Sequence, residues 1–159
     1  MTASIDYQRL YHTGIRVPDL DAAMAELGPA LGVTWAMPMS AAAQPAWTPE
    51  HGQQHLALRF TYSCEGPQHI ELLQGPPGSI WDGHEQPGVH HVGLWCDDVT
   101  AETTRLVADG WTVRLAAKAP ELGYGGYVYV QPPGSQMIVE LVDSIAIPRF
   151  ERWWAGGSL

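Results

Sequence analysis

The sequence predicts an α+β fold built from two tandem modules, each with one strand, one helix and three further strands in that order. An internal repeat is the first observation behind this prediction. The segment that starts at His12 recurs from His91, with identities at histidine, glycine, aspartate and alanine positions. The second observation is a shorter repeat of an aliphatic-Glu-Leu motif at 70–73 and 139–142. Each half therefore begins with a histidine on a strand and ends with a glutamate on a strand.

The first strand and the helix of each module are predicted by the same signals. In each module, an alternation of apolar and polar residues predicts the strand. An aspartate follows, and the apolar residues after it recur at helical spacing, which predicts the helix. Asp19 and Asp98 are the expected N-caps, and Gly32 and Gly110 end the helices. The predicted ranges are a strand over 11–17, a helix over about 20–31, a strand over about 89–97 and a helix over about 99–109.

The remaining strands follow from alternation, or from short apolar runs between turn residues. They are predicted over 54–63 and 68–74, and over about 111–117, 126–131 and 136–143. A stretch rich in proline, alanine and serine over 37–49 predicts a loop with a weak strand.

The whole chain, residues 1–159, is assigned to a single domain. Module one spans about 8–75, and module two spans about 89–143. A linker rich in glycine and proline covers about 76–88. The tail, residues 144–159, carries aromatic residues, and we expect it to pack on the protein or on a dimer partner rather than hang free.

Composition limits the partners. A net charge of −9 with only 8 Lys and Arg argues against nucleic acid or an anionic membrane, and leaves a small molecule as the expected ligand. We find neither a signal-peptide pattern nor an apolar stretch of the roughly 18 residues that cross a bilayer. Cys64 and Cys96 lie in apolar strand patterns, which is typical of reduced core thiols in a cytoplasmic protein.

Two histidines and two glutamates on a duplicated scaffold predict one metal site. Side chains two apart on a strand share a face, so His12 shares its face with Arg16, and His91 shares its face with Trp95. A carboxylate among apolar strand residues is costly to bury unpaired, and metal binding offers a reason for it to be there. The expected ligands are His12, Glu71, His91 and Glu140. The remaining five histidines do not share this repeated pattern, and we do not expect them to be ligands.

At these residues the chain resembles the vicinal oxygen chelate superfamily, which includes glyoxalase I, methylmalonyl-CoA epimerase, extradiol dioxygenases and bleomycin-resistance proteins. The resemblance covers about residues 8–143 and implies a curled mixed sheet around a metal site, with helices on the outer face. The same four residues fall at the ligand positions of the superfamily. Segments 49–52, 70–73 and 88–92 are most similar to methylmalonyl-CoA epimerase.

The resemblance implies a metal-dependent epimerase or isomerase that transfers an α-proton through a metal-stabilised enolate, with an acyl-CoA among the candidate substrates. One divalent ion (Co, Mg, Mn, Ni, Zn or Fe) and a homodimer are implied as well. Glu140 and Glu50 are the expected proton carriers, although Glu50 also fits an exposed loop carboxylate. Arg16, Trp95 and Tyr124 are the expected substrate contacts, and a salt bridge at the sheet edge is the alternative for Arg16.

Two other functions fit the same residues. A lyase of the glyoxalase I type would use the same four ligands. A metal-free binding or resistance protein would use a cup lined by tryptophans to hold an apolar or aromatic ligand. An extradiol dioxygenase fits less well, because those enzymes bind iron with two histidines and one carboxylate.

Overall fold

The computed structural model describes residues 5–159, so the first four residues of the predicted domain lie outside the described range. The three α-helices of that range are α1 (Leu20–Leu31), α2 (Val99–Ala108) and α3 (Ile147–Trp154). Short 3-10 helices cover Tyr7–Arg9, Pro120–Leu122 and Ser144–Ala146. Among residues 5–159, no helix has the length and apolar character that a membrane crossing requires.

The strands form one mixed sheet, which confirms the predicted α+β class. They are β1 (Leu10–Arg16), β2 (Met39–Thr48), β3 (Gly52–Tyr62), β4 (His69–Gln74), β5 (Gly88–Cys96), β6 (Thr112–Ala116), β7 (Tyr127–Gln131) and β8 (Val139–Asp143). Their hydrogen-bonded order, β1-β4-β3-β2-β6-β7-β8-β5, is that of a closed barrel. β1 and β4 are parallel, and so are β5 and β8, which makes the first and last strands of each module neighbours.

The repeated helix signals form as predicted. The Asp19 carboxylate accepts a hydrogen bond from the backbone N–H of Ala22, and the Asp98 carboxylate accepts one from Ala101, each at 2.9 Å. Gly32 ends α1 in the left-handed conformation, with φ of 68°.

The stretch predicted as a loop with a weak strand is instead the full strand β2. Proline and alanine lower its local strand propensity, but its place between β3 and β6 supplies partners that the local sequence does not reveal. Pro45 lies inside it, and the Pro45 carbonyl accepts a hydrogen bond from the Tyr127 hydroxyl.

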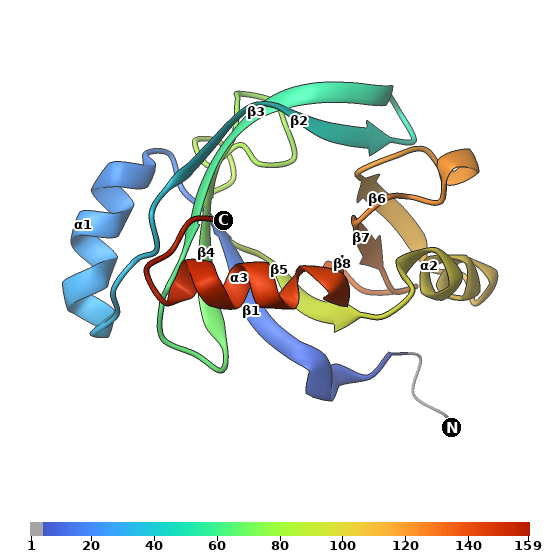
Figure 1. The fold of residues 1–159 in the computed structure, drawn as a ribbon. Coiled ribbons are helices and arrows are strands. Elements are labelled where there is room, and N and C mark those ends of the chain that lie inside the picture. The colour runs from blue at the N-terminus through green and yellow to red at the C-terminus, as the bar shows by residue number, and fades with distance from the viewer. Residues whose placement is uncertain (1–4) are drawn as a thin grey trace. The chain divides into compact units, whose positions relative to one another are not determined.

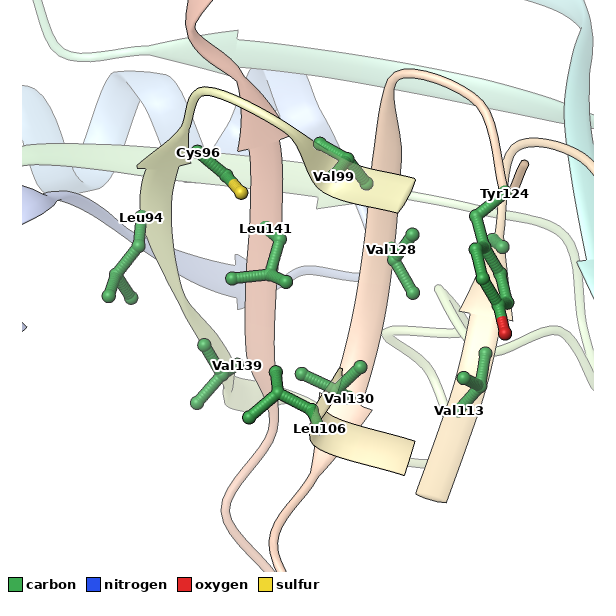
Figure 2. Packing of buried hydrophobic residues seen from close by; sticks show 11 residues of the cluster. Leu94, Cys96, Val99, Leu106, Val113, Tyr124, Val128, Val130, Val139 and Leu141 are labelled. Atoms are coloured by element: carbon green, nitrogen blue, oxygen red, sulfur yellow. The ribbon is translucent and has the colours of Figure 1, made fainter. Parts of the chain in front are cut away.

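The chain divides into two compact units. Unit one consists of residues 5–11, Pro45–Gln54 and His91–Ile145. In this unit α2 packs on β6, β7 and β8. Figure 2 shows the apolar cluster that results, in which side chains of these strands and of β5 gather beside Val99 and Leu106 of α2. Burial of this face of the sheet holds α2 in place.

Leu106 provides a test of this packing. Its side chain is fully buried, so Leu106→Ala is expected to lower the free energy of unfolding by about 2–5 kcal/mol through lost burial and a residual cavity. Val107→Ala, next to it on α2 but 43% exposed, is the matched control and should change stability by no more than about 0.5 kcal/mol. Urea titration of both variants measures the difference, and equal losses would contradict this account of the core.

Unit two consists of His12–Gln44, His55–His90 and Ala146–Leu159. Here α1 packs on β4, where Leu20 of the helix meets Leu72 and Val17. The tail packs on its own chain, as α3. Figure 1 shows α1 and α3 on opposite sides of β3 and β4, with α1 drawn in light blue and α3 in red.

An ion pair in unit one ties the N-terminal segment to the end of β5. Both terminal nitrogens of Arg9 donate to the Asp97 carboxylate at 2.7 Å, and the Ser144 hydroxyl donates to it as well. The Arg9 hydrogen bonds, with a smaller contribution from Ser144, hold the pKa of Asp97 well below its ordinary value.

This pair should make stability fall in acid. Because the folded-state pKa of Asp97 is lowered, its carboxylate stabilises the fold at neutral pH, and this contribution is lost progressively as the pH falls below about 4. Asp97→Asn should therefore be less stable than the parent at pH 7, and the gap should narrow at pH 3. Urea titrations at both values test this, with the exposed Glu121→Gln as control. A gap that stays constant with pH would contradict it.

Candidate metal centre

In unit two, the first and fourth strands bring together a histidine and a glutamate. His12 on β1 is fully buried, and Glu71 on β4 is 6% exposed. In the parallel ladder Glu71 is opposite Gly14, two residues after His12, so a position without a side chain leaves room beside the carboxylate. His12 Nε2 and Glu71 Oε2 are 3.3 Å apart.

Unit one contains the same arrangement. His91 on β5 is 2% exposed, and Glu140 on β8 is 8% exposed. Glu140 is opposite Gly93, again the residue two positions after the histidine. The distance between His91 Nε2 and Glu140 Oε2 is also 3.3 Å. The repeat seen in the sequence is thus a repeat of side-chain geometry.

The donor set of these pairs fits a divalent metal ion. The 3.3 Å separations are longer than the 2.7–2.9 Å of a charge-assisted N–H···O bond. Neutral imidazole and carboxylate are common ligands for such ions. Buried His12, Glu71, His91 and Glu140 are thus residues that could hold a metal ion.

Each pair has a tyrosine beside it that the sequence prediction missed. Tyr62 on β3 pairs in register with Glu71, and its ring meets the His12 imidazole edge-on at a centroid distance of 5.2 Å. Tyr129 on β7 pairs in register with Glu140, and its ring lies 4.8 Å from the His91 imidazole. Both tyrosines are buried. The signal was present, because each module has an aromatic-x-Tyr segment, at 60–62 and 127–129.

Two of the predicted substrate contacts are held by neighbouring side chains or backbone. Arg16 follows His12 on the same face of β1, and its Nη1 donates to the Ile80 carbonyl and to Gln86 Oε1, both at 3.1 Å. The linker predicted over about 76–88 therefore binds this guanidinium. Trp95 stacks on Tyr11, with ring centroids 3.7 Å apart and planes within 9°. Contact of Arg16 or Trp95 with a substrate stays a prediction.

The other two predicted residues lie in different surroundings. Tyr124 is buried in the apolar cluster of unit one, beside Val113 and Val128 (Figure 2). Val128 is opposite Leu141 in the ladder, so this cluster is on the face of β8 opposite to the one that carries Glu140. Glu50 is exposed in the turn between β2 and β3. Their roles in binding and catalysis also stay predictions.

His69 is adjacent to the unit-two pair and has a structural partner. In the β1–β4 ladder it is opposite His12, and its Nδ1 is 2.7 Å from the Ser63 carbonyl. A carbonyl only accepts, so Nδ1 carries the hydrogen. Burial lowers the pKa of His69 and keeps the ring neutral near pH 7, against the opposing effect of the Ser63 hydrogen bond.

Residues 11–130 match the model of the glyoxalase/bleomycin resistance protein/dioxygenase superfamily. The chain belongs to this superfamily. The match starts next to His12 and extends through Tyr129, so it includes most of both modules. Comparison with curated proteins gives no match.

Solved structures share the fold at low sequence identity. Methylmalonyl-CoA epimerase from Mycobacterium tuberculosis is 19% identical, with a TM-score of 0.58 over 90% of this chain and 92% of that one. A variant of the Streptomyces coelicolor methylmalonyl-CoA epimerase, in complex with 2-nitronate-propionyl-CoA, is 21% identical, with a TM-score of 0.57 over 87% and 96%. A hypothetical protein from Bacillus halodurans is 15% identical, with a TM-score of 0.56 over 85% and 93%. At these identities the likeness shows the fold.

Proposed function

We propose that His12, Glu71, His91 and Glu140 are ligands of a divalent metal ion, and that the chain is an epimerase or isomerase that transfers a proton on the carbon next to a carbonyl. The observation that carries the proposal is the repeated pair, buried in both units with the same 3.3 Å separation. Two buried carboxylates are costly without a cation, so their duplication favours a bound ion. The superfamily match and the epimerase neighbours support the same reaction class.

A divalent ion, when bound, acts as a Lewis acid on a carbonyl oxygen and makes the neighbouring C–H bond more acidic. The residues of the chain would then move the proton. Glu140 is the first candidate, because its buried carboxylate belongs to the proposed ligand set and could take up the α-proton of a substrate bound there. Glu50, exposed on the turn between β2 and β3, is the candidate for the opposite face of the carbon.

The charge of the chain favours a substrate that carries little phosphate. The sequence has a single lysine, Lys118, and 8 Lys and Arg in total. Recognition of several phosphate groups generally uses lysine or arginine side chains. We therefore place acyl-CoA esters in the test set beside small 2-substituted carbonyl acids, rather than propose a CoA ester as the substrate.

The first experiment measures metal content by plasma mass spectrometry after purification without chelators, and again after loading with Mg²⁺, Mn²⁺, Co²⁺, Ni²⁺, Zn²⁺ and Fe²⁺. We expect about one ion per chain. The loaded protein is then incubated in D₂O with the test set, and proton NMR follows loss of the α-proton signal. Glu140→Gln should stop this exchange, and Glu50→Gln should slow it.

Absence of metal after loading would overturn the proposal and favour a metal-free binding protein on the same fold. Metal uptake without α-proton exchange on the test set, but with conversion of the thiol adduct of a 2-oxoaldehyde into a 2-hydroxyacyl thioester, would favour the glyoxalase-type lyase. The predicted homodimer and cytoplasmic location belong to the same proposal. Light scattering on the purified chain tests the first, and fluorescence imaging of a tagged chain in its host tests the second.

A further inference from the structure

The C-terminal helix lies on the face of the sheet that carries the unit-two ligands. Residues paired directly across a ladder share a face, so Tyr62 is on the face of Glu71, and Phe60 continues that face on β3. Rings of α3 contact both: Trp153 lies 5.8 Å from Phe60 and 5.6 Å from Tyr62, centroid to centroid. The apolar residues that meet α1 are on the other face.

Anchoring contacts fix α3 in this position. The Trp153 side chain is fully buried, and its Nε1 donates to the Met37 carbonyl at 3.0 Å. Phe150 is 8% exposed and meets Tyr62 edge-on at 5.5 Å. A helix held by two buried aromatic side chains and a hydrogen bond behaves as a fixed part of unit two, rather than as a mobile lid.

Trp154 extends this surface toward the metal ligands. Its ring stacks on the His69 imidazole at 3.6 Å, with planes within 18°. His69 is the ladder partner of His12, so the indole is one strand away from a metal-ligand candidate. The Trp154 ring also lies 6.0 Å from Tyr62, which itself contacts His12. Aromatic side chains of β3 and α3 thus form a connected group on the face of the sheet that carries the His12–Glu71 pair, and Tyr62 is its member in contact with His12.

The repeat does not specify this surface. Module two ends with β8, and α3 follows it as an addition outside the duplicated unit. The helix nevertheless packs on unit two, on the face of the sheet where the His12 side chain has no exposure and the Glu71 side chain has 8%. A ligand that reaches this pair while α3 stays in place therefore has little room.

We infer that α3 is a specificity-determining wall, in which Phe150 and Trp154 restrict the group that a ligand places over the His12–Glu71 pair to one that is compact and apolar. This inference rests on the proposed metal site. It assigns the chain to substrates with a small α-substituent, such as a methyl-sized group. Trp154 sets the size limit for this group, because it is the partly exposed member of the wall.

Two hydroxamates of different size test the wall. Acetohydroxamate and 2-naphthohydroxamate present the same two oxygen atoms to a divalent ion but differ in bulk. Each is titrated into the Co²⁺-loaded protein, and the visible absorption of cobalt reports binding. The parent should bind acetohydroxamate more tightly than 2-naphthohydroxamate by about 10-fold or more. Both Trp154→Leu and Trp154→Ala should reduce this ratio, and the reduction should be larger for alanine. Neither variant should change the affinity for acetohydroxamate.

Glu151→Ala, exposed on the same helix, is the matched control and should keep the parent ratio. Near-ultraviolet circular dichroism shows whether α3 still packs in each variant, and Trp154→Leu keeps the test valid if Trp154→Ala unfolds the helix. Absence of cobalt uptake would overturn both the metal site and the wall. Cobalt uptake with equal binding of both hydroxamates, or a ratio unchanged in folded Trp154 variants, would overturn the wall alone.

Discussion

Glu71→Ala and Glu140→Ala are each expected to lower the affinity for a divalent ion by about 100-fold or more, since even partners outside the ligand shell contribute 10–100-fold. The two losses should be similar, because the two carboxylates have the same ladder position, opposite a glycine, and the same 3.3 Å distance to a histidine. Isothermal titration with Co²⁺ or Zn²⁺ measures both.

Thermal unfolding adds a result that distinguishes a metal site from a structural ion pair. At a free metal concentration of 100 times the dissociation constant, the parent should gain about 2.7 kcal/mol, and the variants should gain almost nothing. Without metal, the variants should be at least as stable as the parent, since each removes a carboxylate whose burial costs free energy. A structural His–Glu pair would behave in the opposite way, because its loss would destabilise the metal-free protein.

Glu26→Ala on α1 and Glu121→Ala in unit one are the controls, as both side chains are exposed glutamates outside the pairs. They should leave the affinity for metal unchanged. If Glu71→Ala alone abolished binding while Glu140→Ala had no effect, the ion would belong to unit two, and the proposed set of four ligands would be wrong.

The alternation within strands and the internal repeat were the patterns that the sequence revealed. Alternation at a spacing of two residues predicted most strands, and the internal repeat predicted that both modules carry a His–Glu pair. The pairs formed as expected within each unit, because a strand fixes the side of the sheet on which a side chain lies. Tyr62 and Tyr129 could have been predicted from the same logic, since the aromatic-x-Tyr segments also repeat.

Features that depend on distant partners were not predictable in this way. β2 forms in a stretch with low strand propensity because its neighbours in the sheet provide hydrogen bonds. The aromatic residues of the tail indicated that it packs, but not that α3 would lie beside β3 and β4 on the face of Glu71. Docking of a helix depends on the three-dimensional fit of side chains far apart in the chain, which no local pattern encodes.

Trp153→Ala is expected to lower the free energy of unfolding by about 3–5 kcal/mol, the usual range for a buried tryptophan replaced by alanine. The side chain is fully buried, contacts Phe60 and Tyr62, and donates to the Met37 carbonyl, so the substitution removes burial, ring contacts and a hydrogen bond together. Trp153→Phe keeps most of the burial and should lose less. Urea titration measures both, with Glu151→Ala as the control on the same helix.

The same variant also reports on the position of α3. Once its anchor is lost, the helix should detach before the rest of unit two unfolds, and trypsin should then cut after Arg149 and Arg152 under native conditions. We expect detachment to increase the exposure of His12 and Glu71, which would link the stability of one tryptophan to access at the proposed metal ligands. A loss of less than about 1 kcal/mol, with no increase in cleavage, would show that α3 is held by other contacts, because a buried aromatic anchor is among the few mechanisms that produce large losses.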